Sequence, residues 1–277
     1  MKPENFEYIS ALAKERSGLV MREDKVYLLE SRLMPLARRE GIATLDEFVE
    51  FLRRENDFNA INDVVDALTT NETLFFRDNG PFEAFRNTIM PHILETRATT
   101  KKFRVWSAAS SSGQEPYSLV MILDEMKAAL TGWNYEIIGT DISMRILEKA
   151  QAATYSQFEV QRGMPTDKLI KYFEQDGQHW RLKAPFREQV SFRKANLLED
   201  QRALGMFDVV FCRNVLIYFD RETKTQVLEM IAQVLEMIAQ MMPADGKLFL
   251  GGAETVLGLT DRFAAVEGVK GMYQKVP

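Results

Sequence analysis

The sequence predicts an α/β protein in which an all-helical N-terminal part precedes an open parallel sheet with helices on both faces. The first 70 or so residues have apolar side chains at helical spacing and little β-branched alternation. From Phe103 onwards, short apolar runs alternate with amphipathic segments, which is the pattern of a parallel sheet. Residues 155–192 break this alternation with short polar and aromatic runs. They predict a small antiparallel insertion, with a long ordered loop as the alternative.

The helical part contains four segments with helical periodicity, which read FEYISALAKERSGLV, KVYLLESRLMPLARREG, LDEFVEFLRREN and AINDVVDALTTN. Pro35 lies inside the second of them. Because proline lacks the backbone N–H that a helix interior uses, we expect a kink or a fresh helix start near it.

In the second part, the runs FRVWSA, YEIIGTD, FDVVFCRN and GKLFLGG predict strands, and EPYSLVMILDEMKAAL and SMRILEKAQAA predict helices. The heptapeptide VLEMIAQ occurs twice in tandem, at 227–233 and 234–240. Seven added residues rotate the apolar face of a helix by only ~20°, so we expect one elongated helix and regard the repeat as a duplication without a role in chemistry.

Composition excludes several classes of protein. With 46% hydrophobic and 27% charged residues, the chain is typical of a soluble globular protein. No apolar run approaches the ~20 residues that span a bilayer, and the charged N-terminus lacks a signal-peptide core, so we expect a cytoplasmic protein without membrane insertion. One cysteine, Cys212, and two histidines argue against a disulfide and against a metal site. The net charge of -5 argues against nonspecific nucleic-acid binding as the main role, with a local basic face as the alternative, and we expect no nucleic-acid partner.

A ligand site is predicted where the first strand meets its helix, in VWSAASSSGQEPYS. The small residues 108–113 allow close approach to the backbone, but the G-x-G-x-x-G spacing of dinucleotide enzymes is missing. The next predicted strand ends at Asp141, from where a carboxylate can accept hydrogen bonds from both hydroxyls of a ribose. A helix cap is the alternative role of Asp141. The two features together indicate an adenosine-bearing ligand.

Polar residues at the ends of two further predicted strands converge on the same crevice, because carboxyl ends of parallel strands share one edge. They are Asn196, Arg213 and Asn214. A salt bridge is an equally common role for an arginine such as Arg213, and Cys212 beside it is expected to be a buried core residue.

Four segments carry a family resemblance: NETLFFRD (71–78), RVWSAASSSGQEPYSL (104–119), FCRNVLIYFD (211–220) and LFLGGAE (248–254). In order and spacing they resemble the CheR family of chemoreceptor methyltransferases, and the resemblance extends over essentially the whole chain. It implies a class I, Rossmann-like sheet that binds S-adenosylmethionine, at 91–277, with the small β subdomain at about 155–192. It also implies an N-terminal helical domain that faces the receptor, at 1–70, and a linker that contacts the cofactor, at 71–90.

The resemblance further implies a set of site residues. The expected contacts of S-adenosylmethionine are Asn71, Thr73, Arg77, Glu115, Asp141, Asn196, Leu197, Arg213 and Asn214. Arg77, closest to the transferring methyl group, and Tyr218, beside the transfer site, are the catalytic candidates. A structural role is the alternative for Arg77, and Phe75 and Phe76 are expected to pack in the core or a lid.

The resemblance also names a partner, the cytoplasmic helical domain of methyl-accepting chemotaxis receptors. Lys25, Arg32 and Arg38 fall on the positions of the basic helix that faces it, although a solvated charged face is the alternative. The short turn around residues 175–177 lacks the glycine-rich extension of members that bind a receptor's C-terminal pentapeptide, so we expect no such tether. A monomer is expected.

The expected reaction is transfer of the methyl group of S-adenosylmethionine to receptor glutamates, giving glutamate methyl esters and S-adenosylhomocysteine. One alternative is a regulatory or scaffold protein that binds S-adenosylmethionine or S-adenosylhomocysteine without turnover. Another is a methyltransferase for a small molecule or nucleic acid, but the sequence has neither a base-stacking motif nor a strongly basic face.

Overall fold

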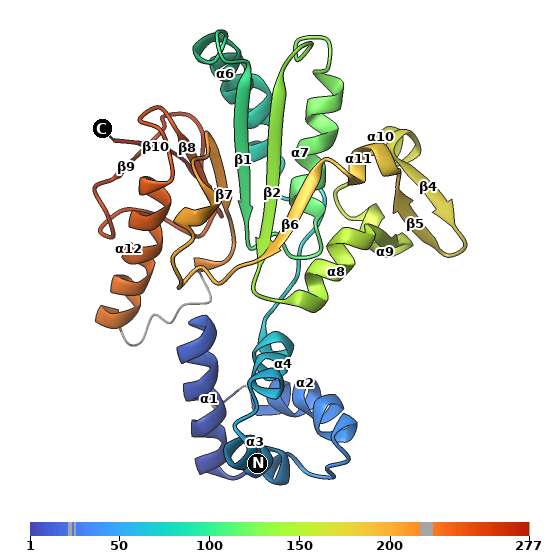
Figure 1. Ribbon diagram of the computed structural model, residues 1–277, viewed down its shortest axis with the longest axis vertical. Coiled ribbons are helices and arrows are strands. Elements are labelled where there is room, and N and C mark those ends of the chain that lie inside the picture. The colour runs from blue at the N-terminus through green and yellow to red at the C-terminus, as the bar shows by residue number, and fades with distance from the viewer. Residues whose placement is uncertain (22–23, 25, 217–223, 277) are drawn as a thin grey trace. The chain divides into compact units, whose positions relative to one another are not determined.

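The computed structural model describes residues 1–21, 24, 26–216 and 224–276, and these form two compact units (Figure 1). The first unit is built mainly from residues 1–70, and the second from residues 71–216 and 228–276. Two of the predicted site residues, Lys25 and Tyr218, lie outside the described residues.

The first unit contains the helices α1 (Pro3–Ser17), α2 (Val26–Arg39), α3 (Leu45–Glu55) and α4 (Phe58–Leu68). α2 continues through Pro35, so the fresh helix start expected there is wrong. Leu29, Leu33 and Ala37, one turn apart on the same face, are completely buried. Their packing against the other helices compensates for the hydrogen bond that the proline removes.

The second unit is built on a seven-stranded sheet with the order β6-β2-β1-β7-β8-β10-β9. The strands are β1 (Lys102–Ala108), β2 (Asn134–Asp141), β6 (Val190–Lys194), β7 (Val209–Cys212), β8 (Lys247–Leu250), β9 (Phe263–Ala265) and β10 (Met272–Lys275). The first five in this order run parallel, which confirms the predicted parallel sheet. β10 runs antiparallel to both β8 and β9, an edge that the sequence analysis did not predict.

Helices cover both faces of this sheet, as predicted. Every residue of β7 and β8 is buried, although successive side chains point to opposite faces. The surrounding helices are α5 (Gly80–Ala84), a π-helix (Phe85–Ile89), α6 (Met90–Thr96), α7 (Gln114–Glu125), α8 (Met144–Ala152) and α12 (Lys224–Gln240). α12 contains both copies of VLEMIAQ, so the expectation of a single elongated helix is confirmed.

A second, three-stranded sheet confirms the predicted antiparallel insertion and excludes the long-loop alternative. Its order is β3-β5-β4, with β3 (Thr154–Ser156), β4 (Phe173–Asp176) and β5 (His179–Leu182). Three short helices accompany it, namely α9 (Gln157–Gln161), α10 (Thr166–Tyr172) and α11 (Ala184–Arg187). The insertion ends earlier than expected, because residues 190–194 form β6 and pair with β2 of the main sheet.

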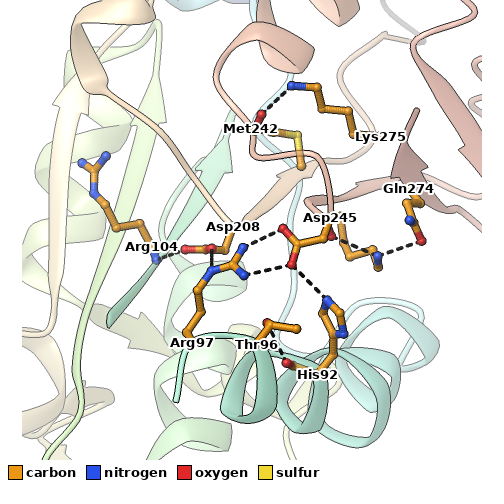
Figure 2. A network of polar contacts seen from close by, with 10 residues as sticks. His92, Thr96, Arg97, Arg104, Asp208, Met242, Asp245, Gln274 and Lys275 are labelled. Carbon is orange, nitrogen blue, oxygen red and sulfur yellow. Dashed lines mark hydrogen bonds and ion pairs between the residues drawn. The ribbon is translucent and has the colours of Figure 1, made fainter. Parts of the chain in front are cut away.

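A network of polar contacts joins the amino-terminal ends of β7 and β8 to α6, as Figure 2 shows. Arg97 donates from Nη1 and Nη2 to Asp245, at 2.9 and 2.6 Å, and from Nε to Asp208, at 3.0 Å. Asp208 also accepts the backbone N–H of Arg104, and His92 Nε2 lies 3.2 Å from Asp245. The guanidinium of Arg97 lowers the pKa of Asp245 to about 2. All three donor nitrogens of the Arg97 guanidinium therefore have a carboxylate partner.

Candidate functional site

The loop between β1 and α7 is built from small residues in unusual backbone conformations. Ala109 and Ser111 have φ values of 59° and 49°, and Gly113 has 92°. A Cβ at Gly113 would lie 2.9 Å from the ring of Tyr117, so this position requires glycine. The loop therefore turns sharply at the carboxyl end of β1 and leaves its backbone within reach of a ligand.

Asp141 lies beside this loop, at the end of β2, with 6% of its surface exposed. Its two oxygens accept hydrogen bonds from Ser111 N at 2.9 Å and from Ser143 N at 3.0 Å. The cap of α8 is Ser143, whose Oγ accepts from Ile146 N, so Asp141 is not the helix cap. These two backbone N–H groups fix the carboxylate in place at the carboxyl end of β2.

The segment 71–79 is attached to the same loop. Ser111 Oγ donates to Asn71 O at 2.7 Å, and Phe76 N donates to Ser118 Oγ at 3.0 Å. Phe76, Asp78 and Asn79 all have positive φ values, between 44° and 66°. Such conformations are costly outside glycine and concentrate at functional sites.

Arg77 lies within this strained turn, and its Nη1 donates to Glu72 O at 3.1 Å. Thr73 is half-buried in the same segment. Phe75 is buried and makes edge contacts with Tyr155 and Phe173, which gives it the expected packing role.

Arg213 connects the turn to the end of β7. Its side chain is 2% exposed, and it donates from Nη1 to Glu115 at 3.0 Å and from Nη2 to Asp78 at 2.7 Å. Nη2 also donates to Arg77 O at 2.9 Å. The salt bridge considered for Arg213 is therefore present, and it joins three of the predicted site residues. Ser107 Oγ fixes the other oxygen of Glu115, at 2.8 Å.

Glu254, which was not among the predicted site residues, organises the segment after β7. Its carboxylate is 9% exposed and accepts three backbone N–H groups, from Asn214 at 2.8 Å, Leu216 at 2.7 Å and Gly251 at 2.6 Å. A Cβ at Gly251 would lie 2.7 Å from that carboxylate, so glycine is required there. An acidic residue two positions after the glycine pair that follows a buried strand was the available signal.

Asn196 and Leu197 follow β6. Ala195 N donates to Asp141 O at 3.0 Å, which holds this turn against the end of β2, and Asn196 Oδ1 accepts from Leu198 N. The carboxyl ends of β6, β2, β1 and β7 thus each contribute predicted residues to one edge of the sheet. Cys212, beside this edge, is completely buried, and burial raises the pKa of its thiol, as expected of a core residue.

The predicted basic residues of the helical unit are used differently. Arg32 donates to Leu68 O and to Thr70 Oγ1, so it links α2 to the end of α4. Arg38 is exposed, whereas Arg39 pairs with Asp63.

None of the helices that the structure describes combines the length and the hydrophobicity of a membrane span.

The site has buried polar groups that a cofactor would satisfy. Within the described residues of the second unit, Ser110 Oγ, Arg213 Nε and Asn214 Oδ1 are buried at this edge without a hydrogen-bond partner. Folded proteins seldom leave such groups unpaired, so a polar ligand at this edge fits the residues present. A buried carboxylate on β2, small residues after β1 and a buried arginine on β7 define an α/β protein that binds a nucleoside cofactor.

Comparison with known proteins gives the family. The model for "CheR methyltransferase, SAM binding domain" matches residues 71–272, and that for "CheR methyltransferase, all-alpha domain" matches residues 4–69. The chain belongs to this family and is an S-adenosylmethionine-dependent methyltransferase. It is 37% identical to chemotaxis protein methyltransferase Cher2 of Pseudomonas putida and 38% identical to chemotaxis protein methyltransferase 1 of Pseudomonas aeruginosa. Each match covers 95% of this chain and 94% of the relative.

Among solved structures, TrmN from Thermus thermophilus is similar over 71% of this chain and 52% of its own, with a TM-score of 0.39 and 13% identity. This likeness is too weak to support a conclusion about function.

Proposed function

We propose that this protein transfers the methyl group of S-adenosylmethionine to glutamate side chains of methyl-accepting chemotaxis receptors. The products are glutamate methyl esters and S-adenosylhomocysteine. The observation that carries the proposal is the position of Arg77. Arg213 anchors its backbone at the carboxyl edge, while its guanidinium forms no ion pair among the described residues. A cation held in this way is suited to bind an incoming carboxylate.

The residues around the edge would hold the cofactor in distinct ways. Asp141 would accept hydrogen bonds from the ribose, and Asn196 and Leu197 would contact the cofactor beside it. Glu115 and Arg213 would hold the charged amino-acid end, with Asn71, Thr73 and Asn214 completing the contacts. S-adenosylmethionine supplies a methyl group that its sulfonium makes electrophilic.

The reaction requires little acid or base catalysis from the protein. A glutamate side chain, with a pKa near ~4.3, is already ionised at neutral pH, so no general base is needed. The protein must align the carboxylate with the methyl group and exclude water from it, and such positioning can contribute up to roughly 7 to 11 kcal/mol. Arg77 would orient the carboxylate, and Tyr218 would add a hydroxyl beside it.

The same proposal covers the partner and the place of action. The helical unit would face the cytoplasmic helical domain of the receptor, with Arg38 and Lys25 as contacts and Arg32 supporting the helix from within. The enzyme would act as a cytoplasmic monomer without a receptor-tail tether.

The test is incubation with methyl-labelled cofactor and the cytoplasmic fragment of a receptor, followed by mild base. We expect label on the receptor that base releases as methanol. Absence of transfer with retained cofactor binding would instead favour the scaffold function. Label that resists base would indicate a different acceptor group.

A further inference from the structure

A cavity of 620 Å³ lies over the carboxyl ends of β7 and β8. Its lining includes Arg213 and Asn214, which follow β7, and Gly252, which follows β8. Asp141 and Asn196 follow β2 and β6, on the other side of β1, and they do not line it. The cavity therefore meets the expected cofactor contacts at Arg77, Arg213 and Asn214 and extends from them over β7 and β8, as a site for the second reactant would.

Arg77 lies at the border between the two regions. It lines the cavity, and its segment is attached through Asn71 to the loop after β1. A carboxylate that enters the cavity can therefore reach Arg77. Pockets of 300 to 1,000 Å³ are typical of small-molecule sites, so ~620 Å³ admits a glutamate side chain together with part of its backbone.

Most of the charges that line the cavity are already engaged. Arg213 pairs with Asp78 at 2.7 Å, and Glu83 accepts a hydrogen bond from Asn79 at 2.6 Å. Lys270 is the exception, because among the described residues it forms neither a hydrogen bond nor an ion pair. An exposed ammonium without a counter-charge in a cavity is a ready partner for an anion.

The position of Lys270 is fixed by the antiparallel edge strand. β10 begins beside the carboxyl end of β8, and Gly271 O accepts from Leu250 N at 2.8 Å. Gly271 has a φ of 76°, and a Cβ there would lie 2.7 Å from Leu250 O, so only glycine permits this approach. Lys270 Nζ then lies over Gly252, 3.7 Å from where a Cβ on that glycine would be.

We infer that Lys270 is a positioning residue that attracts and holds the carboxylate of the acceptor glutamate in this cavity. The inference rests on the proposed function. Methyl transfer breaks a carbon–sulfur bond and forms a carbon–oxygen bond, and the acceptor changes from an anion into a neutral ester. Lys270 therefore favours the acceptor over the product, so it aids both binding of the glutamate and release of its ester. Arg77 aligns the carboxylate for transfer.

The test compares Lys270→Gln and Lys270→Arg with Lys102→Gln, which removes the same charge from an exposed position at the amino-terminal end of β1. Rates of methyl-ester formation are measured against the concentration of receptor fragment, at low and high salt, together with calorimetric binding of S-adenosylhomocysteine. We expect Lys270→Gln to raise KM about five- to tenfold, with kcat within about twofold and unchanged binding of S-adenosylhomocysteine. Lys270→Arg should retain most of the affinity, and the KM of Lys270→Gln should depend less on salt.

An unchanged KM in Lys270→Gln, or an equal rise in Lys102→Gln, would overturn the inference while the wild-type reaction stands. Absence of ester formation by the wild-type protein would instead overturn the proposed function, and the inference with it.

Discussion

Two arginines, the partly exposed Arg97 and the buried Arg213, lie at opposite ends of the strands of the same sheet and have similar partners but different surroundings. Arg97, at the amino-terminal ends of the strands, binds Asp208 and Asp245, and each of its three guanidinium nitrogens donates to a carboxylate (Figure 2). Arg213, at the carboxyl ends, binds Asp78 and Glu115, yet its own Nε has no partner. The first arrangement is complete without a ligand, whereas the second is not.

The backbone around the two arginines differs in the same way. Around Arg213, Phe76, Asp78, Ala109 and Asn214 have positive φ values without being glycine, whereas beside Arg97 one such residue, Lys101, donates its N–H to Arg97 O. Such conformations cost about 1 to 3 kcal/mol each in the least favourable cases and persist where the surroundings enforce them. Ion pairing at the amino-terminal ends of the strands thus stabilises the fold, whereas ion pairing at the carboxyl ends holds a strained site in place. Variants at matched positions should separate these two roles.

The largest effect is expected from Arg77→Ala. Loss of a cation that aligns the reacting carboxylate should lower turnover by about 10²- to 10³-fold, while the thermal midpoint stays within a few degrees. Rates of methyl-ester formation and a melting curve check this. Near-normal incorporation of methyl groups would show that Arg77 has only a structural role.

A matched pair, Arg213→Met and Arg97→Met, compares the two edges directly. Arg213→Met removes the partner of Glu115 and should weaken binding of S-adenosylhomocysteine by about 10- to 100-fold. Arg97→Met should lower the free energy of unfolding by about 2 kcal/mol and leave that affinity unchanged. Calorimetric titration and urea unfolding of both variants provide the readouts, and equal losses of affinity would erase the distinction.

A smaller effect is expected from Glu254→Gln, which replaces one oxygen of a carboxylate that accepts three backbone N–H groups by an amide nitrogen. The loss of about 1 to 3 kcal/mol of local hydrogen bonding should displace Asn214 and weaken cofactor binding about five- to tenfold. Glu136→Gln is the control, because Glu136 pairs with Arg104 at a partly exposed position away from the carboxyl edge. If both variants bind alike, Glu254 does not organise the site.

The smallest effect is expected on the free energy of unfolding at acidic pH. Arg97 lowers the pKa of Asp245 from 3.8 to about 2, so the carboxylate binds fewer protons in the folded state than in the unfolded state. Its stabilisation is present above pH ~3.8 and is lost as the pH falls towards ~2. Because Asp245 is partly exposed, we expect about 1 kcal/mol. Unfolding of wild-type protein and Asp245→Asn between these pH values measures it, and a parallel decline in both would contradict this assignment.

Part of this site could be predicted from the sequence because it follows local rules. A strand that ends in an acidic residue after a small-residue loop places Asp141 at the carboxyl edge, whatever the details of packing. The parallel strands and the small antiparallel sheet likewise follow from patterns within each segment.

Other features depend on contacts between distant segments. The pairing of Arg213 with Glu115 spans 98 residues, and nothing in either segment specifies it. Lys270 lies at the carboxyl ends of the parallel strands only because β10 runs antiparallel to β8. The direction of a strand of four residues cannot be predicted from its sequence. Arg32 belongs to a pattern that predicts a basic helix face, but its hydrogen bond to the end of α4 depends on how the helices pack and could not be predicted from that pattern. Roles of the segment 71–79 came from family resemblance, since its strained turn has no sequence pattern of its own.

We propose above all that the cofactor binds at the carboxyl ends of the strands and not at their amino-terminal ends. Calorimetric titration of S-adenosylhomocysteine into Asp141→Asn and Asp245→Asn tests it with the same chemical change at the two edges. We predict that Asp141→Asn binds S-adenosylhomocysteine about 10- to 100-fold more weakly than the wild-type protein and that Asp245→Asn binds it with wild-type affinity. Wild-type affinity in Asp141→Asn would contradict it.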